Sequence, residues 1–260
     1  MFELTVGLPM FRSSKIAHIA LESLCNQEGI DFEWELLVAE EVEDAFGQDN
    51  LNKYAKRLEE VGCKRIVYKS LGNWIPLSFK WKYLGSLASK TKCFLLQAAD
   101  CYSQPHRLKE TYDLFQDPKV DWVQSPLGCF YHVQTEQMVR FNQDTYKHPC
   151  ALNMAIRTLF VQNLPAVSVP AGVDSWLYRT CTQLKGSDLR VKNNNSENWA
   201  LGVDVHGMNK ISVDRGSMII DIVAPFEETD KTLDDLVPAN IAEFIRSCQA
   251  DAENNRTIYT

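Results

Sequence analysis

Residues 93–108 read CFLLQAADCYSQPHRL, and this segment is the most informative part of the sequence. The short apolar run at 93–96 is typical of a buried strand, and Pro105 opens a predicted helix. Asp100, the single acid between them, would then lie at the carboxyl end of a strand, where open α/β sheets bind ligands. Its hard oxygens suit Mg²⁺ or Mn²⁺, but the same carboxylate could cap the helix or fix the turn. These residues alone leave both alternatives open.

Strand and helix patterns alternate through the first hundred residues. Strands are predicted at residues 4–8, 34–39, 65–68 and 93–96, and helices at about 14–24, 50–61 and 76–89. Short connections between them predict a mostly parallel sheet covered by helices on both faces. Right-handed crossovers bring the carboxyl ends of such strands to one edge. Pro9, Glu40, Glu41 and Asp100 are all expected at that edge.

The second half of the chain has a different character. Its predicted elements are a helix at 105–117, a pair of strands within 121–134, helices at 151–163 and 173–184, a flexible loop at 185–198, a strand at 200–205 that leads to His206, a strand at 217–223, and a helix around 241–248. The segment from residue 226 carries five of the seven net negative charges. We therefore expect one domain over residues 1–225 and an acidic C-terminal extension over 226–260.

Composition narrows the class of protein. A chain of 260 residues with 45% hydrophobic and 23% charged residues is typical of a globular protein. No apolar run approaches the roughly 20 residues of a transmembrane helix, and no basic leader suggests a signal peptide. The eight cysteines form no CxxC pair, which disfavours a structural zinc site and favours reduced thiols in the cytoplasm. No Lys/Arg stripe indicates a nucleic-acid partner.

Five segments occur in an order that carries a family resemblance: LTVGLP at 4–9, WELLVAEE at 34–41, FLLQAADCYSQPHRL at 94–108, GVDSWLYR at 172–179, and His206. Together they resemble GT-A-fold glycosyltransferases of the family-2 type. The resemblance implies a Rossmann-type mixed, mostly parallel sheet, with a nucleotide-sugar-binding half at 1–104 and an acceptor half at 105–225. Two further segments, HPCALNMAIRT at 148–158 and VDVHGMN at 203–209, are similar to transferases that glycosylate capsids of large algal viruses.

The resemblance implies a UDP- or GDP-sugar donor whose diphosphate binds Mn²⁺ or Mg²⁺ at an Asp-x-Asp motif. The matching triplet here is Ala98-Ala99-Asp100. The first aspartate is absent, which weakens the expectation of ribose contacts and of high donor affinity. The aspartate expected to touch the metal is kept. His206 matches the C-terminal histidine that completes the metal site of this fold. A cation there stabilises the charge that develops on the leaving diphosphate.

The resemblance also implies roles for other side chains. Asp174 matches the acidic position of the family's xED motif, so it is the expected catalytic base of an inverting displacement; the alternative is a carboxylate facing the helix dipole. Donor contacts are expected from Pro9, Glu40, Lys80 and Lys82, and acceptor contacts from Asn153, Arg157 and Trp176. Glu41 is expected to be a solvated neighbour of Glu40. Trp74, Trp81 and Trp176 can stack on sugars or pack in the core.

These features favour an inverting, metal-dependent hexosyl- or deoxyhexosyltransferase acting on a glycan or glycoprotein, with sugar, base and oligomeric state left open. A nucleotidyltransferase would need a glycine-rich phosphate loop, and GLPMFRSSK at 7–15 has one glycine. A dinucleotide oxidoreductase would need GxGxxG after a strand. Neither a P-loop nor a local Cys-His pair stands out. A non-catalytic nucleotide-sugar- or glycan-binding module with a degenerate Asp-x-Asp motif remains the alternative from another class.

Overall fold

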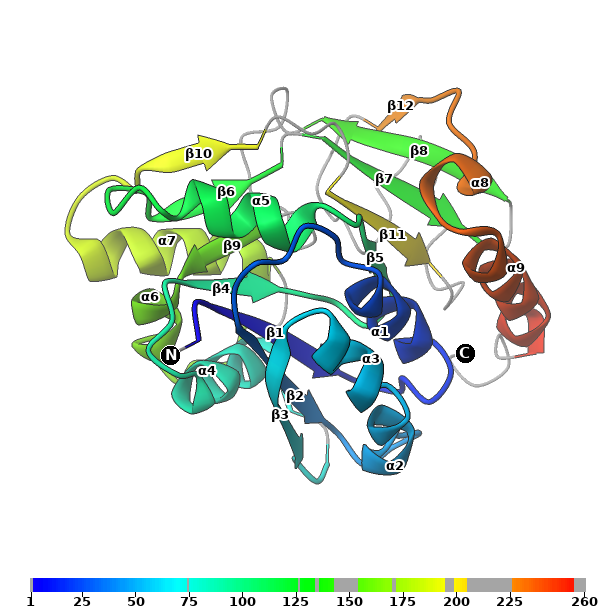
Figure 1. Cartoon of the computed structure of the whole chain (residues 1–260), viewed down its shortest axis with the longest axis horizontal. Helices are drawn as coiled ribbons and strands as arrows, with labels where there is room; N and C mark the ends of the chain where they lie inside the picture. The colour runs from blue at the N-terminus through cyan, green and yellow to red at the C-terminus, as the bar shows by residue number, and fades with distance from the viewer. Residues whose placement is uncertain are drawn as a thin grey trace.

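Two β-sheets flanked by helices make up the fold (Figure 1). The structure is a computed structural model, and it describes residues 2–73, 75–125, 127–133, 136–142, 154–169, 172–194, 199–204 and 226–254. The larger sheet has seven strands in the order β10-β6-β9-β4-β1-β2-β3. These are β1 (Leu4–Met10), β2 (Trp34–Glu40), β3 (Cys63–Ser70), β4 (Cys93–Leu96), β6 (Trp122–Gln124), β9 (Met154–Arg157) and β10 (Val191–Asn193).

The larger sheet is mostly parallel, as predicted. Strands β4, β1, β2 and β3 pair parallel to one another, and β10 pairs parallel to β6. Only β9, among the described strands of this sheet, runs antiparallel to both its neighbours. Every residue of β1 and β2 is buried, which explains their nearly continuous apolar sequences.

Helices cover both faces of this sheet because its strands are apolar on both sides. Leu36 and Val38 of β2 pack in the same cluster as α1 (Ala17–Cys25), whereas Leu37 packs in the cluster of α4 (Leu77–Leu87). The first face also carries α2 (Gln48–Asn52), α3 (Ala55–Glu60) and α5 (Arg107–Leu114), and the second carries α6 (Thr158–Gln162) and α7 (Val173–Lys185).

The smaller sheet has five strands in the order β12-β8-β7-β11-β5. They are β5 (Cys101–Ser103), β7 (Leu127–His132), β8 (Gln137–Asn142), β11 (Ala200–Asp204) and β12 (Phe226–Glu228). Helices α8 (Leu233–Leu236) and α9 (Ala239–Asn254) follow and lie beside this sheet (Figure 1). Ile241 and Ile245 of α9 share one hydrophobic cluster with Leu201 of β11 and Ile19 of α1. The described part of the predicted C-terminal extension therefore packs against the rest of the chain.

Several elements differ from the sequence-based expectation; for example, the helix predicted at 50–61 is divided into α2 and α3. The helix predicted at 151–163 is strand β9 followed by the short helix α6, because residues 154–157 pair with β4 and β6. The loop predicted at 185–198 contains β10, which adds to the edge of the sheet beside β6. The strand predicted at 217–223 lies outside the described residues.

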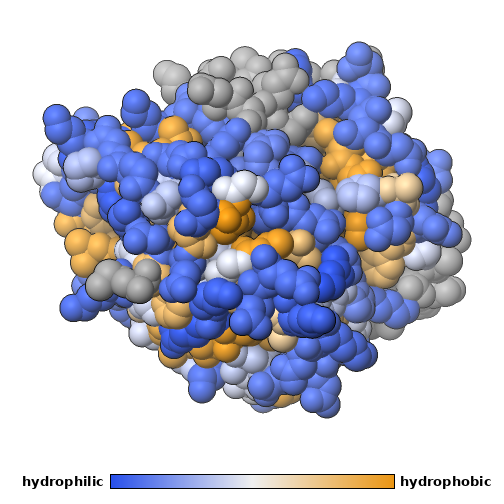
Figure 2. Space-filling model, viewed as in Figure 1, coloured by the Kyte–Doolittle hydropathy of each residue, from blue (hydrophilic) through white to orange (hydrophobic). Residues whose placement is uncertain are grey.

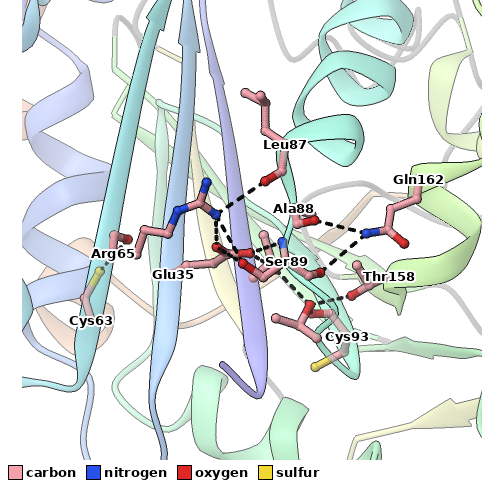
Figure 3. Close-up of polar contacts among 11 residues, drawn as sticks. Glu35, Cys63, Arg65, Leu87, Ala88, Ser89, Cys93, Thr158 and Gln162 are labelled. Atoms are coloured by element: carbon pink, nitrogen blue, oxygen red, sulfur yellow. Dashed lines mark hydrogen bonds and ion pairs between the residues drawn. The ribbon is translucent and has the colours of Figure 1, made fainter. Parts of the chain in front are cut away.

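A buried carboxylate ties α4 to the amino ends of the strands (Figure 3). Glu35 of β2 accepts hydrogen bonds from Thr5 Oγ1 at 2.7 Å and from the Ser89 amide and hydroxyl at 2.7 and 2.8 Å. Arg65 of β3 forms an ion pair with the same carboxylate. Gln162 of α6 donates to the Ser89 carbonyl at 3.4 Å. These contacts hold the end of α4 against β2 and α6.

The distribution of hydrophilic side chains on the surface and the burial of the cysteines are typical of a globular protein. On the face in Figure 2, hydrophilic side chains dominate and the hydrophobic ones form separate patches. Within the described ranges, no helix has the length and apolar character to cross a membrane. The cysteines that the structure describes are all buried: Cys25, Cys63, Cys93, Cys101, Cys129, Cys181 and Cys248.

Candidate functional site

An opening at the carboxyl edge of the larger sheet arises from unequal strand lengths. β4 pairs with β1 only as far as the match of Leu96 with Gly7, whereas β1 continues to Met10. Pro9 therefore lies where β4 has ended, and its missing N–H costs no ladder hydrogen bond on that side. A cavity of about 420 Å³ occupies this position.

The cavity wall is largely apolar and comes from segments far apart in sequence. Helix α4 and the residues before it supply one side, the loop after β1 another, and the turn after β4 a third. The lining residues that the structure describes are Pro9, Met10, Phe11, Ser13, Ile16, Ile75, Pro76, Leu77, Lys80, Trp81, Leu96, Ala98, Ala99, Asp100, Val169 and Val173. Lys80 and Asp100 are the charged members of this set. Most of the apolar members belong to loops, so no periodic signal in the sequence marks them.

Asp100 reaches the cavity from a tight turn between β4 and β5. The Cys101 amide donates to the Ala98 carbonyl at 3.3 Å, which closes the turn with Asp100 as its third residue. The Cys101 thiol donates to Asp100 Oδ1 at 3.4 Å. Ala98 and Ala99 line the cavity beside it. Asp100 therefore belongs to a turn and also lines the cavity, and its role as a metal ligand stays a prediction.

Lys80, on α4, is a buried cation in the cavity wall. Its ammonium donates to the Met10 carbonyl at 3.0 Å, forms an ion pair with Glu41, and lies 5.4 Å from the centre of the Phe11 ring. Burial lowers the pKa of Lys80, and the Glu41 carboxylate acts in the opposite direction. Glu41 is 1% exposed, so the expectation that it is solvated is wrong: it is the counter-ion of Lys80.

Glu40 and Lys82 lie near the cavity without lining it. Glu40 accepts hydrogen bonds from the Phe46 amide at 2.6 Å, the Gly47 amide at 2.9 Å and the Tyr68 hydroxyl at 2.8 Å. Burial and this hydrogen bond raise the pKa of Tyr68. Glu40 thus fixes the loop after β2. Lys82, on α4, donates instead to the Gln162 carbonyl of α6 at 3.0 Å.

The loops after β1 and β2 brace each other at this edge. Arg12 and Glu43 form an ion pair at 2.6 Å, and the Ser14 amide donates to the Asp44 carbonyl at 3.0 Å. Arg12 and Asp44 both have φ of 47°, in the left-handed region that costs L-residues free energy. The wall formed by Phe11 and Ser13 is therefore held by a second loop.

The predicted acceptor-side residues separate in the structure. Asp174 lies in the first turn of α7, directly after the cavity-lining Val173, and Trp176 packs in the cluster around α7. Arg157 ends β9 and pairs in register with Cys93, at the amino end of β4. It therefore lies at the edge opposite Asp100, and its position does not support an acceptor contact. It donates to the Asp117 carbonyl at 2.8 Å.

Several predicted positions lie outside the described residues: Asn153, His206 and Trp74. In the part of the chain that is described, no three His, Cys, Asp or Glu side chains gather as a metal site. Asp100 has the hard oxygen ligands that Mg²⁺ and Mn²⁺ prefer, and it faces a cavity, so the residue present fits such a cation. The second ligand proposed from the sequence, His206, stays a prediction.

No protein-family model matches the sequence, and no curated protein matches it. Solved structures do. The structure of S. aureus TarS, residues 1–349, in complex with UDP-GlcNAc superposes with a TM-score of 0.59 at 13% identity over 78% of this chain and 59% of that one. The mannosyltransferase PcManGT from Pyrobaculum calidifontis, in complex with GDP-Man and Mn²⁺, gives a TM-score of 0.57 at 12% identity over 99% of this chain and 76% of that one.

At these identities the comparisons show the fold, which is the GT-A-like fold expected from the sequence. The chain spans 37% of the length of the longer TarS structure. Neither comparison concerns a viral protein, and most of residues 148–158 and 203–209 lie outside the described ranges. The narrower likeness to algal-virus transferases stays a prediction.

Proposed function

We propose that this chain is an inverting glycosyltransferase that moves a sugar from a nucleoside-diphosphate sugar to a hydroxyl of a glycan or other acceptor. The observation that carries the proposal is the position of Asp100, on the wall of a cavity at the carboxyl edge of β1 and β4. That edge is where open α/β sheets bind ligands. Two proteins of similar fold are bound to UDP-GlcNAc and to GDP-Man with Mn²⁺, which supports a nucleotide-sugar donor.

Asp100 would hold a divalent cation, with His206 as the proposed second ligand. When bound, such a cation stabilises the negative charge that develops on the departing diphosphate. Lys80, which also lines the cavity, would supply a second positive charge, and its burial would strengthen a contact with a phosphate oxygen. The apolar lining excludes water from the bond that breaks.

Asp174 is the proposed base. It follows a cavity-lining residue, and a carboxylate there can accept the proton of the acceptor hydroxyl as that oxygen attacks the anomeric carbon. One displacement from the side opposite the leaving group inverts the configuration of the sugar. Pro9 would pass beneath the nucleotide, and Trp176 would face the acceptor. Glu40 would act on the donor through the loop that it holds.

The test of this function is cation-dependent donor binding. Asp100→Asn should abolish the Mn²⁺-dependent part of the affinity for UDP- or GDP-sugars, because the amide replaces a charged ligand with a neutral one. Isothermal titration across a donor panel, with and without Mn²⁺, measures it. Asp113→Asn, on the exposed face of α5, removes a carboxylate that pairs only with Lys109 in the described structure and should leave binding unchanged. Unaltered Mn²⁺-dependent binding in Asp100→Asn would overturn the assignment.

A non-catalytic nucleotide-sugar-binding module is the second candidate. It is favoured by one observation: Ala98 lines the cavity where the Asp-x-Asp motif has its first aspartate. The two functions differ in turnover. Release of nucleoside diphosphate from a bound donor, with Mn²⁺ and a panel of sugar acceptors, supports the transferase. Selective binding with no release across the whole panel supports the module.

A further inference from the structure

Gln97 clamps the turn that presents Asp100. Its side chain is completely buried and lies between the last residue of β4 and the turn. The amide nitrogen donates to the Ala98 carbonyl at 3.0 Å and to the Cys101 carbonyl at 2.7 Å, so one side chain grips the residues at both ends of the turn. The Gln97 backbone amide donates to Gly7 of β1 at 3.0 Å. The clamp is thereby anchored to the central strand.

Ser103 and Arg107 orient the side-chain amide of Gln97. Its oxygen accepts a hydrogen bond from the Ser103 hydroxyl at 2.5 Å and one from Arg107 Nη1 at 3.3 Å. Arg107 is also fully buried, and it donates to Ser103 Oγ at 2.9 Å and to the Leu96 carbonyl at 3.0 Å. These bonds dictate which end of the Gln97 amide faces the turn.

We propose that Gln97, oriented by Ser103 and Arg107, is the positioning residue that fixes Asp100 for the donor diphosphate and its cation. The inference rests on the proposed function. A metal ligand acts only in a narrow range of positions, so the groups that hold it contribute to affinity without touching the ion. Asp100 sits third in this four-residue turn, so the backbone geometry of the turn contributes to the position of its carboxylate.

The two ends of the Gln97 amide have different partners, so one substitution can remove its hydrogen bonds to the turn and keep those from Ser103 and Arg107. Gln97→Glu keeps the shape of the side chain and both acceptor bonds, and it adds a charge opposite the buried Arg107. It removes the N–H donors, and a carboxylate oxygen then faces the Ala98 and Cys101 carbonyls. The hydrogen bonds from Ser103 and Arg107 to this side chain remain, whereas its two hydrogen bonds to the turn are lost.

We expect Gln97→Glu to lower the affinity for Mn²⁺ together with UDP or GDP by about 10-fold or more, the range typical of groups that hold a metal ligand. The thermal midpoint should fall no further than in the Gln27→Glu control, because the buried Arg107 faces the new charge. Isothermal titration with Mn²⁺ and the nucleoside diphosphate, beside thermal unfolding, measures both. Unchanged or increased affinity would overturn the positioning role.

Gln27→Glu is the matched control. Gln27 is also buried, its amide donates to the Ser23 and Gln104 carbonyls at 2.9 Å each, and its oxygen accepts from the Leu108 amide at 3.0 Å. The same chemical change there should lower stability and leave affinity intact. If affinity follows stability in both variants, Gln97 is merely structural.

Asp100→Asn separates this inference from the proposed function. Loss of binding in Asp100→Asn with full binding in Gln97→Glu overturns the positioning role alone. Full binding in both overturns the function as well. Should Gln97→Glu not fold, Ser103→Ala removes the 2.5 Å bond that orients the clamp and should weaken the same affinity. Full affinity in Ser103→Ala would then overturn the positioning role.

Discussion

Two side chains of opposite charge, Asp100 and Lys80, face one cavity from different elements. The cavity wall is mostly apolar, so charges placed there interact more strongly than they would in water. Glu41 balances Lys80 in the structure, which lets a lysine remain charged although it is 4% exposed. At the scale of single residues, the cavity therefore carries one carboxylate and one ammonium, to which the proposed function assigns a cation and the donor diphosphate.

Asp174→Asn tests the proposed base. The amide has nearly the same shape but cannot take the proton of the acceptor, so donor binding should stay within about twofold and transfer should fall by about 10²-fold or more. Binding is measured by titration with the donor, and transfer by release of nucleoside diphosphate in the presence of acceptor.

Asp234→Asn is the control for this prediction. Asp234 also lies in the first turn of a helix, α8, but it is exposed and pairs with Arg246 away from the cavity. If Asp174 acts only on its helix dipole, both variants lose at most about 1 kcal/mol of stability and both keep their transfer rate. That result would remove Asp174 from the mechanism.

At the scale of elements, the C-terminal end of α7 is fastened to the beginning of β6. Asp121 accepts a hydrogen bond from Lys185 Nζ at 2.5 Å and one from the Arg190 amide at 2.9 Å. Burial opposes the charge of Asp121, but these hydrogen bonds and the neighbouring cations outweigh it and hold its pKa below the usual range. Because Asp174 starts the same helix, this fastening also contributes to the position of the proposed base.

Asp121→Asn should therefore destabilise the fold in a pH-dependent way. A lowered carboxyl pKa stabilises the folded chain above the unfolded pKa of about 3.9, and this contribution is lost as pH falls through the folded value. We expect a loss of about 1 to 3 kcal/mol at pH 7 and a smaller loss below pH ~4. Urea unfolding at both pH values measures it. Asp113→Asn, an exposed pair, should cost under about 1 kcal/mol. A loss at Asp121 independent of pH would contradict the argument.

The elements that the sequence predicts well are those whose pattern has one interpretation. β4 lies where it is expected, because a short apolar run before a turn is typical of a buried strand. The start of α7 does so as well, because the polar–apolar repeat after Gly172 has the period of a helix. Residues 154–157 fit both a strand and a helix, and only pairing with β4 and β6 decides between them. Arg157 ends this strand beside Cys93, a position that does not support the acceptor contact implied by the resemblance.

Asp100 could be proposed from sequence because it is a lone acid after a short apolar run. The counter-ion role of Glu41 and the clamp formed by Gln97 could not, since both depend on distances between α4, β2 and α5 that no local pattern contains. Buried polar partners are selected by three-dimensional packing, and their spacing in sequence is arbitrary.

At the scale of the whole molecule, α9 closes the hydrophobic cluster between α1 and the smaller sheet. Ile245→Ala should cost about 2 to 5 kcal/mol, because Ile245 is fully buried and the truncation leaves a cavity. Denaturant unfolding measures it. Glu243→Ala, at an exposed position of the same helix, should change stability by less than about 0.5 kcal/mol. Equal effects of the two variants would show that α9 does not pack as described.

The turn at residues 98–101 is also one of the places where the chain passes from the larger sheet to the smaller one. Gln97 bonds to β1 in the larger sheet, and the Asp100 carbonyl accepts a hydrogen bond from Val203 of β11 in the smaller one at 3.0 Å. Asp100 therefore lies at a junction between the two sheets. A shear of the two sheets against each other would displace the backbone of this residue, so this joint between the sheets also sets the position of the proposed cation ligand.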